Sequence, residues 1–271
     1  MKAFLPGLAA LALPSALAAQ QAAPPPAHSD AQPDDVVVEG QLDLPNNPDT
    51  VTRPSIANAQ NPQDSAVANR AKFEFSERIA KCVARGKLST RAQLRAVLDD
   101  APNKATQVYA QDRLKRSNVT CSEGTELRYF SEPNLGYSIY DRGAYMIEAI
   151  NTYAPDLKLT SRDTGDPAVQ ARFNTRETPL SRYRLPVDYR YFEIAVCMVR
   201  IQPRLSLRLV RTSGPSKQIS RIASAIVDNA HICVGDAKRV YFDPTQFRMY
   251  IADAVYRWGV AKLGVNTLIP D

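Results

Sequence analysis

The sequence predicts a mainly α-helical protein, in which two tandem four-helix units, each with one internal disulfide, follow a disordered N-terminal arm. A series of short motifs recurs in order at an offset of 115 to 111 residues, and each copy holds two of the four cysteines. An internal repeat of this length indicates two copies of one supersecondary unit. The expected segments are a signal peptide (1–18), the arm (19–70), unit 1 (71–154), an Arg-rich connector (155–190) and unit 2 (191–271).

The N-terminus has the three-part pattern of a secretory signal peptide. Lys2 precedes an apolar stretch that ends in small residues at Ala16–Ala18, which predicts cleavage after Ala18. The stretch is shorter than the roughly 20 residues of a membrane span, and prolines interrupt it. No later segment has the composition of a span, so we expect a periplasmic or secreted protein without a transmembrane helix.

The arm and the rest of the chain differ in charge. Residues 20–70 hold eight prolines and two Arg against seven Asp/Glu, a net charge of −5. Residues 71–271 hold 31 basic against 21 acidic side chains, a net charge of +10. The arm buries too little apolar surface to offset its chain entropy, so we expect it to be disordered beside a basic, folded body.

One short segment of the arm is prone to form a strand. Asp34–Gly40, with the sequence DDVVVEG, resembles the coupling-box segment near the mature N-terminus of TonB-dependent outer-membrane transporters. The resemblance implies an extended strand that a partner captures by strand addition. Because no plug or barrel sequence follows, an unpartnered β-prone patch is the alternative.

The repeat consists of ordered matches between the two halves. The matched pairs are Glu77–Arg85 with Phe192–Arg200, Cys121 with Cys233, Tyr129–Phe130 with Tyr241–Phe242, and Ala144–Tyr145 with Val255–Tyr256. Aromatic pairs at constant spacing are typical of a core, so we expect these tyrosines and phenylalanines to pack inside the units. The predicted helices are 72–85, 90–101, 104–116 and 137–152 in unit 1, and 189–200, 203–211, 216–229 and 244–262 in unit 2.

Local signals support the individual helices. Thr90–Gln93 has the capping-box pattern, which predicts a helix start at Thr90. Residues 204–209 alternate like a strand, but equivalent repeats share one architecture, so we predict a helix with Pro203 in its first turn. Asp243 followed by Pro244 predicts the start of the last helix. The expected apolar faces are Phe75, Ile79, Cys82 and Val83 in the first helix, and Phe247, Ile251, Val255 and Trp258 in the last.

The four cysteines are expected to form structural disulfides. Four cysteines allow three connectivities, and the repeat selects one of them. If both units have the same fold, Cys82 pairs with Cys121 and Cys197 pairs with Cys233. A redox-active or metal-binding set of thiols is the alternative, but the chain lacks a C-x-x-C spacing and has only two histidines. We therefore expect no metal and no cofactor.

The connector carries the candidate anion-binding residues. Basic side chains interleaved with tyrosines suit an anionic envelope lipid or glycan. A solvated loop is the alternative, and an envelope protein is another conceivable partner. Export argues against nucleic acid. The candidates are Arg162, Arg172, Arg176, Arg182, Arg184 and Arg190.

A catalytic site has little support in the sequence. His231 is the single histidine of the body, and no catalytic motif accompanies it, so we assign no catalytic residue. Acidic pairs such as Asp99 and Asp100 are most simply solvated helix faces. The alternative to a binding protein is a periplasmic hydrolase with a site near His231, between the two units.

The recurring unit has a Cys-Val-Ala-Arg or Cys-Met-Val-Arg motif, a second cysteine and a closing helix with Ala-Tyr or Val-Tyr. This pattern resembles units of exported two-repeat cysteine-pair proteins of Gram-negative bacteria, over about residues 72–262. The resemblance implies the helical two-copy arrangement and no activity. The sequence therefore favours an exported, non-enzymatic binding or scaffolding protein with a basic body.

Overall fold

The protein is mainly α-helical, as the sequence predicts. The computed structural model describes residues 36–38, 62–122, 139–213, 217–235 and 240–271. The predicted signal peptide, most of the arm and the Tyr129–Phe130 pair lie outside the described residues. The first half contains α1 (Pro62–Ala84), α2 (Leu88–Asp99), α3 (Ala105–Ser117), the 3₁₀ helix η1 (Val119–Ser122) and α4 (Ile139–Tyr153). Then come α5 (Ser161–Gly165), α6 (Pro167–Ser181), α7 (Pro186–Ile201), α8 (Pro203–Arg211), α9 (Lys217–Asn229), η3 (His231–Val234) and α10 (Pro244–Leu263).

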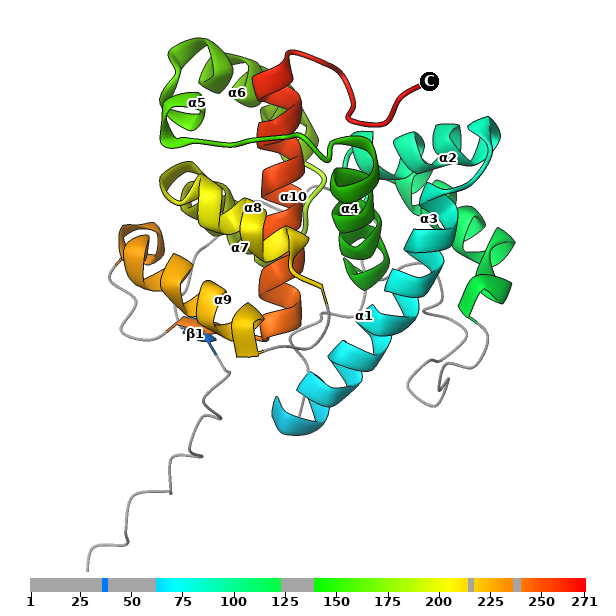
Figure 1. The fold of residues 1–271 in the computed structure, drawn as a ribbon, viewed down its shortest axis with the longest axis horizontal. Coiled ribbons are helices and arrows are strands. Elements are labelled where there is room, and N and C mark those ends of the chain that lie inside the picture. The colour runs from blue at the N-terminus through cyan, green and yellow to red at the C-terminus, as the bar shows by residue number, and fades with distance from the viewer. Residues whose placement is uncertain (1–35, 39–61, 123–138, 214–216, 236–239) are drawn as a thin grey trace, which may run out of the picture. The chain divides into compact units, whose positions relative to one another are not determined.

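Helix α10 is the central element of the fold. It contacts α1, α4, α6, α7, α8 and α9, and Figure 1 shows it between α4 on one side and α7 and α8 on the other. Every residue from Phe247 to Ala261 is buried, including the predicted apolar face. Asp243 caps the helix by accepting from the backbone N–H groups of Thr245 and Gln246 at 2.8 and 3.0 Å. This cap and Pro244 at the first position start the helix where the sequence predicts.

The first two helices begin earlier than predicted. Helix α1 starts at Pro62, so residues 62–70 of the predicted disordered arm are helical. Proline is well suited to the first turn of a helix, so Pro62 is a suitable start for α1. Helix α2 starts at Leu88, and the capping box predicted at Thr90 is wrong. Gly86 and Thr90 approach so closely that a Cβ atom on the glycine would lie 2.8 Å from the Thr90 side chain.

The prediction of an irregular connector over 155–190 is also wrong, because two helices and the start of a third occupy it. Thr160 and Asp163 form a reciprocal capping box at the start of α5. Asp166 caps α6 by accepting from the N–H groups of Ala168 and Val169, and Pro167 follows it. The side chain of Phe173 in α6 stacks on Trp258 in α10, with ring centroids 4.3 Å apart. The connector is thus packed against the central helix.

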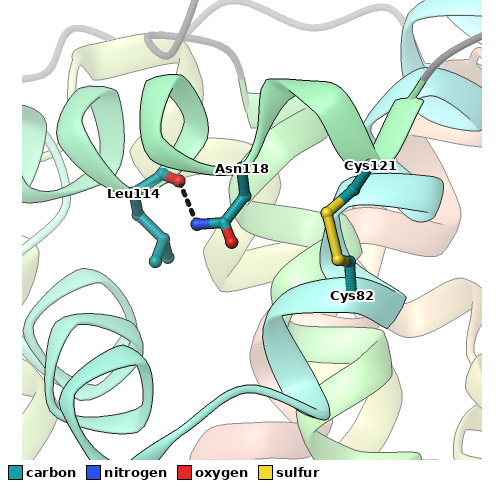
Figure 2. Close-up of a disulfide and its surroundings, with 4 residues drawn as sticks. All are labelled: Cys82, Leu114, Asn118 and Cys121. Atoms are coloured by element: carbon teal, nitrogen blue, oxygen red, sulfur yellow. Dashed lines mark hydrogen bonds between the residues drawn. A yellow bond between two sulfur atoms is a disulfide. The ribbon is translucent and has the colours of Figure 1, made fainter.

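Both disulfides have the predicted pairing. Cys82 of α1 is bonded to Cys121 of η1, and Cys197 of α7 is bonded to Cys233 of η3. Figure 2 shows the first bridge beside the end of α3, where the Asn118 side chain donates to the Leu114 carbonyl at 2.8 Å. This hydrogen bond satisfies one of the open carbonyls at the helix end and fixes the turn into η1. Each bridge ties the first helix of a half to the 3₁₀ helix before its last helix.

The two halves have the same order of elements but share one interior. In the described part of each half, three helices and a 3₁₀ helix precede a long last helix, and the first helix packs on the last. The last helices α4 and α10 also pack on each other, and a single hydrophobic cluster includes Phe75, Ile147, Met198 and Ile251. Residues 33–271 accordingly form one compact unit. The equivalence of the halves as tandem four-helix units stays a prediction.

The described residues include one pair of strands. Strand β1 (Val36–Val38) pairs antiparallel with β2 (Val240–Phe242), and Val37 lies opposite Tyr241. Thus the only described part of the arm before α1 is attached to the body directly before α10. The predicted aromatic pair Tyr241–Phe242 contributes its backbone to this pairing.

Candidate functional site

The six candidate arginines of the connector do not converge on a common site. Arg172 donates from Nε to the Ala261 carbonyl at 2.7 Å. Arg176 donates to the Asp99 carboxylate at 2.9 Å and to the Asn266 carbonyl at 2.7 Å. Arg162 and Arg182 are exposed, and Arg190 is half-buried.

Arg184 is buried, so the prediction that it binds an external anion is wrong. Its side chain is 2% exposed and donates from Nη2 to Asp253 Oδ2 at 2.6 Å. Nη1 lies 3.3 Å from both carboxylate oxygens of Asp188. The guanidinium also lies 3.6 Å from the centroid of the Phe192 ring. Arg184 is therefore part of the interior and belongs to a larger charge network.

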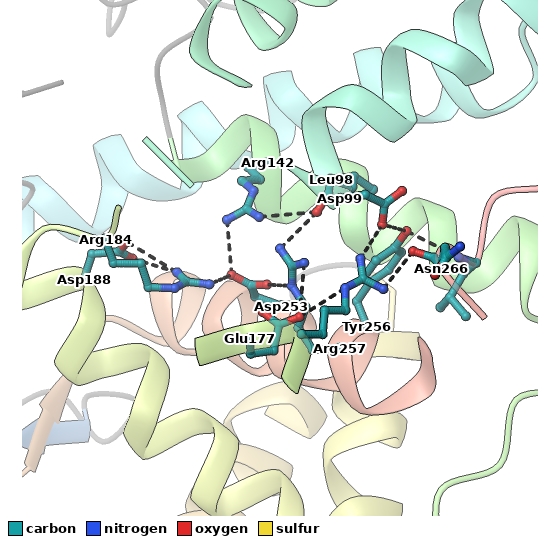
Figure 3. Close-up of polar contacts among 12 residues, drawn as sticks. Leu98, Asp99, Arg142, Glu177, Arg184, Asp188, Asp253, Tyr256, Arg257 and Asn266 are labelled. Carbon is teal, nitrogen blue, oxygen red and sulfur yellow. Dashed lines mark hydrogen bonds and ion pairs between the residues drawn. The ribbon is translucent and has the colours of Figure 1, made fainter. Parts of the chain in front are cut away.

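The centre of this network is Asp253 in α10 (Figure 3). Its Oδ2 accepts from Arg184 at 2.6 Å and from Arg142 of α4 at 3.3 Å, and its Oδ1 accepts from Arg257 Nε at 3.1 Å. Arg257 Nη1 also lies 3.4 Å from Glu177 of α6. We call Arg142, Glu177, Arg184, Asp188, Asp253 and Arg257 the buried charge network. Its three cations and three anions balance.

The network also reaches the end of α2. The Leu98 carbonyl accepts from Arg257 Nη2 at 2.9 Å and from Arg142 Nη2 at 3.4 Å. Carbonyls in the last turn of a helix have no intrahelical partner and carry partial negative charge, so they favour cations. One cluster of side chains thereby joins α2 and α4 of the first half to α6, α7 and α10.

The electrostatics keep this network ionised. Burial alone would raise the pKa of Asp253, but the guanidinium groups of Arg184, Arg142 and Arg257 hold it well below its ordinary value. Burial lowers the pKa of Arg142 to about 10, in spite of the attraction to Asp253. The pKa of Arg257 is raised because its attraction to Glu177 and Asp253 outweighs the cost of burial. These charges are paired, and all but the half-buried Asp188 are buried, which is the pattern of a structural ion network.

A second buried ion pair lies in the first half. Lys115 Nζ of α3 is 2.6 Å from Asp141 Oδ1 of α4, and both side chains are 1% exposed. Ser76 of α1 donates to the same carboxylate oxygen at 2.5 Å. This pair joins three helices and is closed to solvent.

The alternative catalytic site has no constellation around His231 among the described residues. His231 is exposed on η3, and the structure places no described carboxylate within ion-pair distance of its imidazole. The neighbouring Cys233 is not a free thiol, because it is bonded to Cys197. Within the described ranges no three His, Cys, Asp or Glu side chains are grouped as metal ligands would be.

A run of exposed basic residues without a carboxylate partner among the described residues follows the connector. The sequence from Ile194 to Val227 contains six Lys/Arg and no Asp/Glu. Five of these six side chains are exposed, and none has an ion pair with a carboxylate in the part of the chain that the structure describes. We call these five the α8–α9 basic surface. They are Arg200 at the end of α7, Arg204 and Arg208 on α8, and Lys217 and Arg221 on α9.

Local helix geometry places this charge outside. Arg204 and Arg208 are four residues apart and therefore lie on one face of α8, while Leu207, Leu209 and Val210 are buried on the other. Helix α8 packs on α9, whose Ile222 and Ile226 are buried. The sixth cation, Arg211, is used internally, since it donates to the carbonyls of residues 154, 155 and 157.

Sequence reasoning missed both the network and the basic surface. The signal for the network is an Asp253–Arg257 pair inside a helix whose other faces are apolar. The signal for the basic surface is a stretch of 34 residues without an acidic side chain.

None of the described helices combines the length and the hydrophobicity that a membrane crossing requires. Comparison with known proteins finds no matching family model, no similar curated protein and no similar solved structure.

Proposed function

We propose that this protein is exported and acts as a non-enzymatic binding or scaffolding protein that attaches to anionic phospholipid surfaces of the envelope. The α8–α9 basic surface is the binding site. The observation that carries the proposal is the acid-free segment 194–227, whose Arg200, Arg204, Arg208, Lys217 and Arg221 are exposed without a carboxylate partner among the described residues. By contrast, three of the connector arginines, Arg172, Arg176 and Arg184, donate to other groups of the protein.

The shape of the site favours an extended partner over a compact anion. A compact anion is held by donors that converge in a pocket. Here the basic side chains project from three helices into solvent, and their helices bury the apolar faces inside the body. A membrane surface with many negative headgroups suits this arrangement.

The expected strength of attachment is moderate. Each Lys or Arg close to an anionic membrane contributes about 1 kcal/mol, so five contribute on the order of 5 kcal/mol before entropy losses. The attraction falls when salt shortens the Debye length, which is about 10 Å at 0.1 M. Reversible, salt-sensitive binding is therefore expected.

The expected compartment is consistent with this role. The two disulfides suit an oxidising compartment such as the periplasm or the exterior. The signal-peptide pattern at residues 1–18 would direct the chain there.

Vesicle sedimentation tests the proposal. The exported, disulfide-bonded protein is mixed at low salt with phosphatidylglycerol-containing vesicles and with neutral phosphatidylcholine vesicles. The variant Arg204→Gln, Arg208→Gln, Arg221→Gln removes three charges, so its affinity for the anionic vesicles should fall about 100-fold, from about 1 kcal/mol per residue. The matched control is Arg78→Gln, Arg85→Gln, Arg113→Gln, which removes the same charge from exposed positions of the first half.

The control variant is expected to lose less than about threefold, because long-range attraction is screened. Equal losses in both variants, or equal binding of the native protein to neutral vesicles, would contradict a localised anionic-lipid site. Binding to a soluble anionic polysaccharide without binding to vesicles would replace the lipid with a glycan and overturn the proposal as stated.

A further inference from the structure

The two disulfides differ in their exposure to solvent. Cys82 of α1 is exposed, and Cys121, to which it is bonded in Figure 2, is half-buried. Cys197 and Cys233 are both half-buried, and Cys233 packs against the hydrophobic cluster. A disulfide is reduced only where a thiolate reaches one of its sulfur atoms. Cys82 is therefore the most accessible of the four cysteines for attack from solvent.

The side chains around Cys82 are basic. Residues three and four positions apart are neighbours on a helix surface. Arg78 lies four residues before Cys82 on α1, and Arg85 directly follows the helix, three residues after Cys82. Both arginines are exposed, and neither has an ion pair with a carboxylate among the described residues. Positive charge of this kind favours a thiolate over a thiol.

The corresponding position before Cys197 is acidic. Glu193 lies four residues before this cysteine on α7 and Arg200 three residues after it, so the two charges offset each other. Cys82 and Cys197 both lie in the last two turns of a helix, where the negative end of the helix dipole, about half a charge, disfavours a thiolate. The two full charges of Arg78 and Arg85 outweigh this effect only at Cys82.

Other contacts besides the first bridge hold α2 and α3 in place. Leu94 and Leu98 of α2 and Leu114 of α3 are buried in the hydrophobic cluster. Lys115 of α3 also forms the buried ion pair with Asp141 of α4, at 2.6 Å. Opening of the first bridge would therefore release the covalent link between α1 and η1 while these packing contacts remain.

We propose that Cys82–Cys121 is a thiol–disulfide exchange site, which a dithiol reductant opens, whereas Cys197–Cys233 is a permanent structural bridge. Exposed disulfides are typical of labile or regulatory bridges, and reactive cysteines lie in exposed, electropositive surroundings. Both features occur together at Cys82. The proposal is independent of the contact with anionic lipid.

The reduction consists of two exchanges. A thiolate of the dithiol attacks Sγ of Cys82, the Cys82–Cys121 bond breaks, and Cys121 leaves as a thiolate that takes up a proton. The second thiol of the reductant then loses its proton and attacks the reductant sulfur bonded to Cys82, and Cys82 leaves as a thiolate. The two cysteines gain two electrons, and the dithiol is oxidised to a disulfide. Arg78 and Arg85 attract the incoming thiolate and stabilise the departing one.

Timed reduction of the folded protein tests the proposal. The disulfide-bonded protein is treated with dithiothreitol, samples are quenched with iodoacetamide, and mass spectrometry of the peptides gives the alkylated fraction of each cysteine. Far-UV circular dichroism follows the helices over the same period. The variant Arg78→Gln, Arg85→Gln removes both cations beside Cys82. The matched control Lys158→Gln, Arg162→Gln removes the same charge from exposed positions outside α1 and η1.

Cys82 and Cys121 should be alkylated at least about tenfold faster than Cys197 and Cys233, while the circular dichroism stays native. The Arg78→Gln, Arg85→Gln variant should open the first bridge about three- to tenfold more slowly. The control should change neither rate by more than about twofold. Equal rates for the two bridges, or opening only as the helical signal is lost, would overturn the exchange site. A native rate in the variant would overturn the role of the two arginines.

Two further variants identify the reacting sulfur. Cys121→Ser leaves the thiol of Cys82, and Cys82→Ser leaves the thiol of Cys121. The thiol of Cys82 should react with a nitrobenzoate disulfide reagent at least about threefold faster, because it is exposed and lies beside the two arginines. A faster reaction of Cys121 would contradict attack at Cys82.

Discussion

At the scale of single residues, Asp253 determines how the interior tolerates its charges. It lies in a helix that is buried over most of its length, and three guanidinium groups surround its carboxylate. Removal of one partner from a buried ion network leaves the remaining charges desolvated and uncompensated. Asp253 is therefore a position where a small chemical change should have a large effect on stability.

Replacement of this carboxylate by the amide in Asp253→Asn should lower the free energy of unfolding by about 3 to 5 kcal/mol. Urea denaturation followed by circular dichroism measures the effect. The control is Asp112→Asn, which breaks an exposed pair with Arg116 four residues away and should cost less than about 0.5 kcal/mol. Similar costs for the two variants would contradict the central position of Asp253.

Asp253 should also make stability sensitive to acid. In the folded protein the pKa of its carboxyl is well below the ordinary value of 3.8, to which it returns on unfolding. As pH falls below about 4, the unfolded chain takes up this proton and the folded protein does not, so unfolding becomes more favourable. The contribution of Asp253 is complete above about pH 5 and is lost progressively as pH falls toward the folded pKa.

The measurement is the free energy of unfolding at pH 5 and at pH 3 for the native protein and for Asp253→Asn. The native protein should lose about 1 kcal/mol more than the variant over this interval, since the variant lacks the proton-binding group. Parallel losses in the two proteins would show that the carboxyl of Asp253 is not held ionised.

At the scale of elements, the contact between α4 and α10 joins the two halves of the protein. The helices approach closely at Gly143, where a Cβ atom would lie 2.4 Å from Cγ and 2.6 Å from Cβ of Met249. Atoms cannot share that space, so a larger side chain would force the helices or Met249 to move. The close approach also keeps Arg142, the neighbour of Gly143, within reach of Asp253 in α10.

Gly143→Ala should therefore destabilise the protein by about 1 to 3 kcal/mol, although alanine is the better helix former. The matched control is Gly165→Ala, where the added Cβ meets nothing within 4 Å, and it should be neutral or slightly stabilising. Thermal denaturation compares the two. In a double-mutant cycle, Gly143→Ala should cost less in the Met249→Ala background, and strictly additive costs would contradict the clash.

The elements that the sequence predicts well are those with local signals. Asp243 and Pro244 start α10, Pro203 starts α8, and the two helices begin within the range expected. The connector also has local signals, namely the caps Thr160 and Asp166, but its density of arginine and proline is equally typical of a loop. Residues 204–209 alternate like a strand but lie in helix α8, as the repeat predicts. An alternation over six residues is too short to determine a strand.

The buried charge network could not be predicted in the same way. The partners of Asp253 are Arg142, Arg184 and Arg257. Only Arg257 lies on the same helix, four residues away. Which distant arginines reach one carboxylate depends on how α4, α10 and the turn between α6 and α7 pack. From its sequence, the Arg-rich connector is therefore expected to be exposed. In the structure, Arg184 is buried and Arg176 is paired with Asp99.

At the scale of the whole molecule, the basic side chains differ in whether they pair with carboxylates inside the protein. Cations of the connector and of α10 neutralise buried carboxylates, while the cations from Arg200 to Arg221 have no such partner among the described residues. The two disulfides and the network hold the helices that carry both sets in one compact unit. These cations are the proposed contact with anionic lipid.

Arginine-selective covalent labelling with and without anionic vesicles tests this contact, because it reports on each guanidinium separately. Mass spectrometry of the peptides gives the labelling of every arginine. We expect strong protection of Arg204, Arg208 and Arg221, with unchanged labelling of Arg78 and Arg113. Protection that is uniform over the molecule, or confined to the first half, would contradict it.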